Sequence, residues 1–449
     1  MSQYLDKIEA KPGSQPASIH NEKQISDPYE ASLCEEQIEH APQGTASASK
    51  ALFMLLKAFV GTGVIFLPKA FSNGGLILST VLMVILGTIC LGSFQLLVAA
   101  QQRIGGSYGD VAQHLYGRYL KMLINFFLCI SQMGFVASYL IFISENIGIV
   151  VNTVNNCNVP FDAKYYTWIV IAVIVPVCWI RKIARLSYIA ILADVFIAFN
   201  LVCVLYFTSN QISHNGFGEN VILINQKDFG LMIGTATFSY EGIGMILPIV
   251  EGMKHPEKFP RVVSAGICIS TLVFMLIGAM GYSAYGDITQ ASVVSNLPRV
   301  PLSTTVQVLY SCAMILTCPF MLYPALEIIE KAIFGLRSGQ TNLTVKWLKN
   351  FVRSLVPIVC TAVSFGVGSS NLDKFVSLVG CVACVPLCFI FPGLFHYKIT
   401  KNKYLKAIDV LLVVWGLGIM IYTMYITIDS WIHPTASTTV VLDIDGCSS

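Results

Sequence analysis

The sequence predicts an all-α polytopic membrane protein. Of its 449 residues, 55% are hydrophobic and only 12% are charged, and the mean hydropathy is +0.68. A soluble globular chain has about 25% charged residues. The apolar residues gather into repeated runs of about 20, the length of helix that crosses a bilayer. Two of these runs are interrupted by glycine and proline at matching places, which indicates broken helices.

Eleven apolar runs are long enough to be membrane spans. The fourth is short, and the eighth is long and contains Pro319 and Pro324. The predicted spans are residues 51–72, 75–100, 121–150, 165–180, 186–208, 229–250, 262–285, 303–334, 350–368, 373–396 and 406–431.

Lysine and arginine residues are frequent in one set of loops and rare in the other, and the two sets alternate along the chain. Loops rich in these residues stay in the cytosol. This places residues 1–48, which are polar, acidic and rich in Ser, Gln and Pro, in the cytosol as a disordered tail. The membrane domain covers residues 49–432, and residues 433–449 form a tail on the lumenal or extracellular side.

The first predicted span carries Gly61 and Gly63 around Thr62, followed by Pro68. Glycine weakens a helix and proline removes a backbone N–H, so we expect two half-helices with an unwound joint. Unwound backbone at mid-membrane depth occurs only where it lines a cavity. The segment is therefore a candidate binding site. The alternative is that its small residues only let another helix pack closely.

The sixth predicted span repeats this pattern. The segment from Gly242 to Pro248 matches the segment from Gly61 to Pro68: glycine, any residue, glycine, an aliphatic run and Leu-Pro. The two segments are five spans apart, and because five is odd, the second enters the membrane from the opposite side. This predicts a 5+5 inverted repeat in which helices 1 and 6 are broken. The repeats cover about 51–208 and 229–396, and the helix 406–431 is an addition.

The joint of two half-helices presents free N–H groups at one helix end and free carbonyls at the other. A small zwitterion suits this arrangement, with its carboxylate on the N–H groups and its ammonium on the carbonyls. Glycine lets such a molecule reach the backbone. The predicted substrate-binding residues are Val60, Gly61, Thr62, Gly63, Ser239, Tyr240 and Gly242.

Glu241 lies beside the second glycine pair, close to mid-membrane. An ionised side chain is expensive at that depth, so we expect a functional role, as a group that takes and releases a proton. The alternative is a structural glutamate that caps the broken helix or pairs with Lys57. Asp194 in the fifth span and Glu145 in the outer third of the third span are further candidates for proton coupling, although Asp194 could only brace helix packing.

Other classes of function have little support in the sequence. The net charge of +3 is small and the basic residues lie between spans, which argues against nucleic-acid binding. Cys381, Cys384 and Cys388 share a helical face but have no His or carboxylate neighbours, so we expect packing rather than a metal site. The isolated carboxylates argue against an intramembrane enzyme, and no catalytic residue is predicted.

The segment from Lys57 to Phe71 resembles the first-helix signature of the amino acid/auxin permease superfamily. The match continues at residues 238–244, 255–260, 281–286, 323–325 and 384–392. It is most similar to the proton-coupled animal amino acid transporters and the fungal vacuolar amino acid exporters of the Avt type. The resemblance implies a LeuT-type fold, amino acid substrates and proton coupling, with Glu241 at the glutamate of the proton-coupled branch. The animal members have a histidine where this chain has Met54, so any proton role of that histidine does not carry over to this chain.

The sequence therefore predicts a proton-coupled secondary transporter of mainly neutral amino acids, which exports them from a vacuole or lysosome to the cytosol. A plasma-membrane importer is an alternative, as is an amino-acid sensor with little flux whose N-terminal tail binds a cytosolic regulator. Sodium coupling is a third alternative. The expected partners are amino acids, protons and the lipid bilayer, and no cofactor is expected besides the proton as coupling ion.

Overall fold

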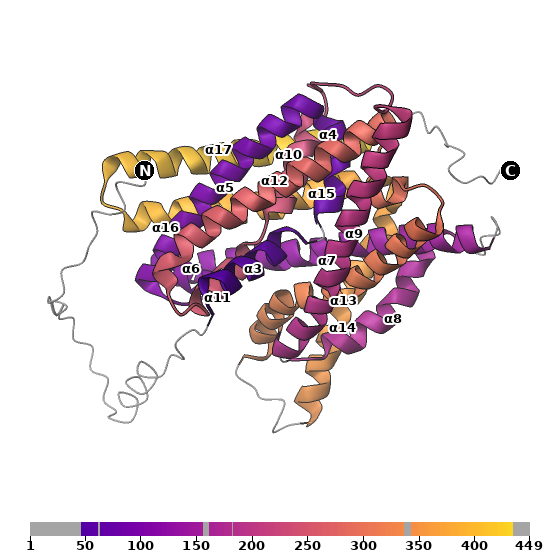
Figure 1. Cartoon of the computed structure of the whole chain (residues 1–449). Helices are drawn as coiled ribbons and strands as arrows, with labels where there is room; N and C mark the ends of the chain where they lie inside the picture. The colour runs from indigo at the N-terminus through magenta and orange to yellow at the C-terminus, as the bar shows by residue number, and fades with distance from the viewer. Residues whose placement is uncertain (1–45, 62, 156–160, 182, 336–342, 434–449) are drawn as a thin grey trace, which may run out of the picture. The chain divides into compact units, whose positions relative to one another are not determined.

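The computed structural model describes residues 46–61, 63–155, 161–181, 183–335 and 343–433, so most of both predicted tails lies outside it. Apart from one isolated bridge, the regular elements in these ranges are all helical (Figure 1). Nine of the described helices are long and apolar enough to cross a membrane. A bent helix pair could add one broken span, and a shorter apolar helix covers Ala163–Cys178. The prediction of an all-helical chain with many spans is confirmed.

The bent pair consists of α3 (Ala48–Phe59), then η1 (Gly63–Phe66) and α4 (Leu67–Gly74). The first half continues with α5 (Leu76–Ile104), α6 (Tyr108–Tyr116), α7 (Arg118–Val154), η2 (Ala163–Tyr165), α8 (Tyr166–Cys178) and α9 (Ile183–Asn215).

The second half begins with α10 (Phe229–Tyr240), α11 (Ile243–Glu251), η3 (Pro256–Lys258), α12 (Phe259–Tyr285), η4 (Gly286–Ile288), η5 (Val293–Asn296), α13 (Pro301–Phe334) and α14 (Leu343–Val367). It ends with η6 (Ser369–Asn371), α15 (Leu372–Val379), the π-helical turns η7 (Gly380–Cys384) and η8 (Pro386–Ile390), α16 (Phe391–Ile399) and α17 (Lys403–Ile432).

Burial separates the inner helices from the outer ones. In the most apolar stretch of each span, 83% of the residues are buried in α10–α11 and 89% in α15–α16, against 17% in α17. All of these stretches are apolar, so the difference reflects what surrounds them. The helices α10, α11, α15 and α16 form the interior, whereas α17 turns most of its apolar side chains outward, as suits contact with lipid.

The second broken span is held between two neighbours. Helix α10 packs on α4 of the first broken span and on α15, while α12 packs on α3, α4 and α5 (Figure 1). The contact between α10 and η7 depends on glycine, because a Cβ on Gly380 would overlap the carbonyl of Gly234. Small residues allow helix backbones to approach this closely. The interior packing therefore brings the two broken spans together.

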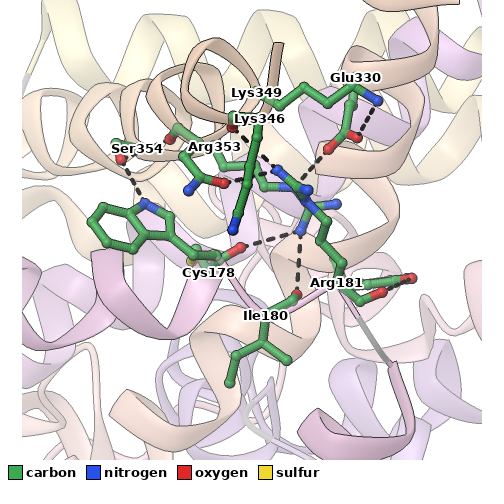
Figure 2. Close-up of polar contacts among 11 residues, drawn as sticks. Cys178, Ile180, Arg181, Glu330, Lys346, Lys349, Arg353 and Ser354 are labelled. Carbon is green, nitrogen blue, oxygen red and sulfur yellow. Dashed lines mark hydrogen bonds and ion pairs between the residues drawn. The ribbon is translucent and has the colours of Figure 1, made fainter. Parts of the chain in front are cut away.

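An ion-pair cluster lies where α8, α13 and α14 meet (Figure 2). Glu330 is 2.7 Å from Nε of Arg353 and 3.0 Å from Nζ of Lys349. Nη1 of Arg353 donates to the carbonyls of Cys178 and Ile180 at 3.2 and 3.3 Å. Carbonyls at a helix C-terminus have no intrahelical partner, so Arg353 caps α8. We call these five residues the Arg353 clasp.

Further bonds tie the turn after α8 to the same helices. Trp179 donates its ring N–H to Ser354 at 2.9 Å, and Arg181 donates to the side chain of Asn350 at 2.8 Å (Figure 2). Tyr323 of α13 donates its hydroxyl to the carbonyl of Arg181 at 3.0 Å. The turn that leads into α9 is thus anchored on α13 and α14.

The folded part begins before the end of the predicted tail. Ala46 donates its N–H to the carbonyl of Gly252 and accepts the N–H of Lys254, both at 3.0 Å. The side chain of Ser47 caps the N-terminus of α3. Residues 46–48, which the sequence places in the tail, are thus hydrogen-bonded to the helical part of the chain. The local sequence of Ala and Ser does not predict this, because the hydrogen bonds of Ala46 are made with Gly252 and Lys254, far along the chain.

Candidate functional site

The first helix break lies at the first glycine pair. Helix α3 ends at Phe59, and Val60 closes its last turn by donating its N–H to the carbonyl of Leu56 at 2.7 Å. The helix resumes at Gly63, bent by 41° from α3. Thr62 lies outside the described residues. The last carbonyls of α3 and the first N–H groups of η1 lack intrahelical partners and are available to a ligand.

The second helix break lies between α10 and α11. Helix α10 ends at Tyr240 and α11 begins at Ile243. Between them, Glu241 has extended backbone, with φ −70° and ψ 120°, and the carbonyl of Gly242 accepts the N–H of Met245 at 2.9 Å. The unwound residues free carbonyls at the end of α10 and N–H groups at the start of α11.

The two breaks lie against each other, and two of the glycines are needed for this contact. A Cβ on Gly63 would lie 3.2 Å from both Cα and Oγ of Ser239. A Cβ on Gly242 would lie 2.6 Å from a ring carbon of Phe59. At these two positions the close-packing explanation of the glycines therefore applies.

The other two glycines face open space. A Cβ on Gly61 would meet only the carbonyl of Lys57, at 3.5 Å, and a Cβ on Gly244 only the Gln132 side chain, at 3.9 Å. Packing does not require glycine there. Both positions line a cavity, where a missing side chain lets a ligand approach the backbone.

The cavity has a volume of about 640 Å³, within the range of small-molecule binding sites. It reaches from the two breaks along α3 to Ala46 and Lys50 at the start of that helix. Its wall is mostly apolar. The lining side chains near the breaks are those of Phe59, Gln132, Phe135, Tyr139, Phe238, Ser239 and Glu241. The part of the cavity that follows α3 is lined by Phe53, Met54 and Lys57 of α3, Asp194 and Ile197 of α9, and Thr317, Phe320 and Met321 of α13.

Two charged features lie in this wall. Nζ of Lys57 is 2.7 Å from Oδ2 of Asp194, and it also lies 5.5 Å from the ring centroid of Phe320. Glu241 is only 6% exposed, and its Oε1 has no hydrogen-bond partner among the described residues. Lys57 therefore pairs with Asp194, and the alternative in which it neutralises Glu241 does not apply to this structure.

The structure brings together six of the predicted site residues. The cavity wall includes Gly61, Gly63, Asp194, Ser239, Glu241 and Gly242. Val60 is not part of this wall, and Thr62 is outside the described residues, so its role stays a prediction.

Tyr240 and Glu145 are not brought to the cavity. The Tyr240 hydroxyl is 2.8 Å from that of Thr271 and donates to the carbonyl of Met83 at 3.1 Å, so the ring is directed at α5 and α12. Glu145 lies on α7 six residues beyond Tyr139, the last cavity residue of that helix. Six residues correspond to about 9 Å along a helix. A direct role in binding is therefore unsupported for Tyr240, and Glu145 is remote from the site.

Sequence reasoning missed the parts of the wall that α7 and α13 provide. Gln132, Phe135 and Tyr139 come from α7, and Thr317 and Phe320 from α13. The polar Gln132 and Thr317 inside apolar spans were the available signal. The aromatic residues carried none, because an aromatic side chain in an apolar span can face lipid as well as a cavity.

The comparisons with known proteins agree with this fold. Residues 44–429 match the family model described as transmembrane amino acid transporter protein. Vacuolar amino acid transporter 3 of Saccharomyces cerevisiae is 39% identical over 396 residues, and that of Schizosaccharomyces pombe is 37% identical over 385. Each alignment covers 86% of this chain but only 57% and 58% of the respective relative. The chain thus spans less than two thirds of the length of these relatives.

A solved structure shares the fold at low sequence identity. Mhp1 in an inward-facing conformation matches with a TM-score of 0.56 at 12% identity, covering 90% of this chain and 96% of that one. Closed Mhp1, a nucleobase-cation-symport-1 family transporter, matches with a TM-score of 0.54 at 12% identity, covering 90% and 98%. The family match extends over nearly all of the described residues and confirms the resemblance seen in the sequence. The chain belongs to the transmembrane amino acid transporter family, a family of multi-pass membrane transporters rather than enzymes.

Proposed function

We propose that this chain moves mainly neutral amino acids together with protons and exports them from an acidic vacuole or lysosome to the cytosol. One observation carries the proposal: two broken helices meet at a cavity with the buried Glu241 in its wall. The yeast relatives are named vacuolar amino acid transporters, which supports the membrane and the substrate class.

The proposed architecture has eleven spans arranged as a 5+5 inverted repeat with one added helix. The nine long helices, the bent pair and the short helix Ala163–Cys178 together supply that number within the described residues. The breaks at Gly61–Gly63 and Glu241–Gly242 would open the two repeats, and α17 would be the addition. The distribution of lysine and arginine supports a cytosolic N-terminus, so the cavity would extend toward the cytosol.

The proposed binding mode uses the free groups of both breaks. N–H groups near Gly61 and Gly63 would hold the carboxylate of the amino acid, and carbonyls at the end of α10 would accept from its ammonium group. Gln132 faces the same space and would contribute to recognition. The apolar wall suits an uncharged side chain.

Glu241 is the proposed proton carrier. It lies in the cavity wall at the second break and has no basic partner among the described residues. A buried carboxyl of this kind is easily held neutral and can exchange its proton when water enters the cavity. Asp194 is less suited to this role because Lys57 already compensates its charge.

The test is transport by the purified full chain in liposomes under an imposed pH gradient, with a panel of labelled amino acids. One pH unit can sustain about tenfold accumulation if one proton moves with each amino acid. We expect neutral amino acids to accumulate on the less acidic side, unchanged when choline replaces sodium. Accumulation that needs sodium would overturn proton coupling. Saturable binding without flux would favour the sensor, and transport only of other solutes would overturn the proposal.

A further inference from the structure

The ion pair between Lys57 and Asp194 stands on the route between the two breaks and the mouth of the cavity. Lys57 is one turn before Gly61 on α3, about 6 Å along the helix axis. Asp194 faces it from α9, and Phe320 of α13 places its ring beside the ammonium group. The two side chains are 15% and 24% exposed, so both reach the cavity. The side chain of an amino acid held at the breaks would extend to this distance.

The pair removes net charge from this part of the cavity. The described residues that line the cavity include four that can carry charge, namely Lys50, Lys57, Asp194 and Glu241. Lys50 is exposed at the mouth, where water screens it, and Glu241 lies at the break. Between them, a cation and an anion 2.7 Å apart nearly cancel at the distance of a passing side chain.

Among the described residues, the wall near the pair has no further charge to compensate a charged side chain. Its lining there includes the apolar Met54, Ile197 and Met321 and the uncharged Thr317. A lysine or glutamate side chain entering this region would lose hydration and find both Lys57 and Asp194 already occupied by each other. An uncharged side chain has no charge to desolvate and needs no ionic partner.

We infer that the Lys57–Asp194 ion pair determines charge selectivity, by excluding both cationic and anionic amino acids from the site. This inference rests on the proposed function and extends it by naming the residues that set the substrate class. It assigns Asp194 a task other than proton transfer. It also explains why a lysine and an aspartate lie side by side in a mostly apolar wall.

The test removes one charge at a time and measures the ratio of charged to neutral amino acids transported in liposomes. Lys57→Met leaves the Asp194 carboxylate unpaired, and we expect the lysine-to-leucine ratio to rise about tenfold, the effect of about 1.4 kcal/mol. Asp194→Asn leaves the Lys57 ammonium unpaired, and the glutamate-to-leucine ratio should rise by a similar factor. The double substitution K57M/D194N should restore a preference for neutral amino acids.

Matched controls separate selectivity from general damage. Lys331→Met and Glu327→Gln break an ion pair of 2.7 Å that lies outside the cavity, and neither ratio should change. Met54→Lys leaves the Lys57–Asp194 pair intact but adds an unpaired cation to the wall, with Met54→Gln as its neutral counterpart. If the single variants of the pair fail to fold, Met54→Lys still tests the inference through an increased glutamate-to-leucine ratio.

The outcomes are distinct. A lysine-to-leucine ratio that rises only in Lys57→Met and a glutamate-to-leucine ratio that rises only in Asp194→Asn, both reversed in the double variant, support the inference. Unchanged ratios, or a rise of the same ratio in both single variants, overturn it while the proposed function stands. A wild-type chain that moves no amino acid overturns the proposed function and the inference with it.

Discussion

The hydroxyl oxygen of Ser239 lies 3.4 Å from the carbonyl oxygen of Gly63, while it donates to the carbonyl of Thr235 at 3.0 Å. Its hydrogen is thus used within α10, and the approach to Gly63 is a packing contact. The two helix breaks are therefore in direct contact. Gly63 and Gly242 lie at this contact, whereas Gly61 and Gly244 face the cavity, so we expect different effects when they are substituted.

Gly61→Ala should leave the fold intact and impair transport. The added methyl group projects into the cavity and meets only the Lys57 carbonyl at an ordinary distance of 3.5 Å. We expect the free energy of unfolding in detergent to stay within about 0.5 kcal/mol of the wild-type value, as for substitutions without a clash. Transport should fall for small and large amino acids alike, because the methyl group would hold the carboxylate off the backbone. Transport equal to that of the wild type would show that Gly61 does not border the substrate.

Gly242→Ala should destabilise the protein, because the Phe59 ring must move to admit the methyl group. Overpacking of this kind costs about 1–3 kcal/mol. Thermal unfolding in detergent measures the effect. Gly418→Ala on α17 is the matched control, since a Cβ there meets nothing within 4 Å and should cause no loss. Equal melting temperatures for both variants would contradict the close contact between the breaks.

Glu241→Gln should abolish proton-driven accumulation while sparing exchange of one amino acid for another. Glutamine keeps the size and polarity of the side chain but cannot release a proton. We expect the roughly tenfold accumulation sustained by one pH unit to fall to equal concentrations on both sides. Glu145→Gln, which changes a carboxyl remote from the cavity, should keep the pH dependence. The reverse result would transfer the proton role to Glu145.

Removal of Arg353 from its clasp should be strongly destabilising. Arg353→Gln leaves Glu330 without its closest partner and the carbonyls of Cys178 and Ile180 without a donor. Breaking one side of a buried ion pair costs about 3–5 kcal/mol. The exposed pair of Lys331 with Glu327 is the control, and its loss should cost at most about 0.5 kcal/mol. A melting temperature of Arg353→Gln close to wild type would mean that the clasp does not hold the turn after α8.

The carboxylate of Asp110 makes stability depend on pH at the N-terminus of α6. Burial opposes its ionisation, but hydrogen bonds from Lys121 and Ser107 outweigh burial and hold its pKa below the usual value. A lowered folded-state pKa stabilises the protein above the unfolded value near 4, and this stabilisation is lost as the pH falls through the folded value. Asp110→Asn should thus cost about 1 kcal/mol or less at pH 7, with the difference from wild type shrinking below about pH 4. A difference in melting temperature that persists at low pH would contradict this assignment.

The broken helices were predictable because their causes are local. Gly61, Gly63 and Gly242 weaken the helical ladder wherever they occur, and the Leu-Pro steps that follow mark where the second halves begin. The family signature around them was visible for the same reason, since it is a run of neighbouring residues.

The orientation of side chains at the breaks was not predictable in this way. The sequence predicts that Ser239 and Tyr240 both bind substrate, yet Ser239 faces Gly63 and Tyr240 bonds to Met83 and Thr271. Consecutive residues of an α-helix point about 100° apart, so one of the two can face the cavity while the other points away. Which one does so depends on how α10 is rotated against its neighbours.

The sequence by itself determined that this is a multi-spanning helical membrane protein with two interrupted spans and amino acid transporter ancestry. These properties follow from composition and from neighbouring residues. The tertiary structure alone decided that Lys57 pairs with Asp194 rather than Glu241, that Arg353 caps α8, and that α7 and α13 complete the cavity. Such pairings join residues from distant parts of the chain, and they depend on helix packing angles and rotations that no local pattern encodes.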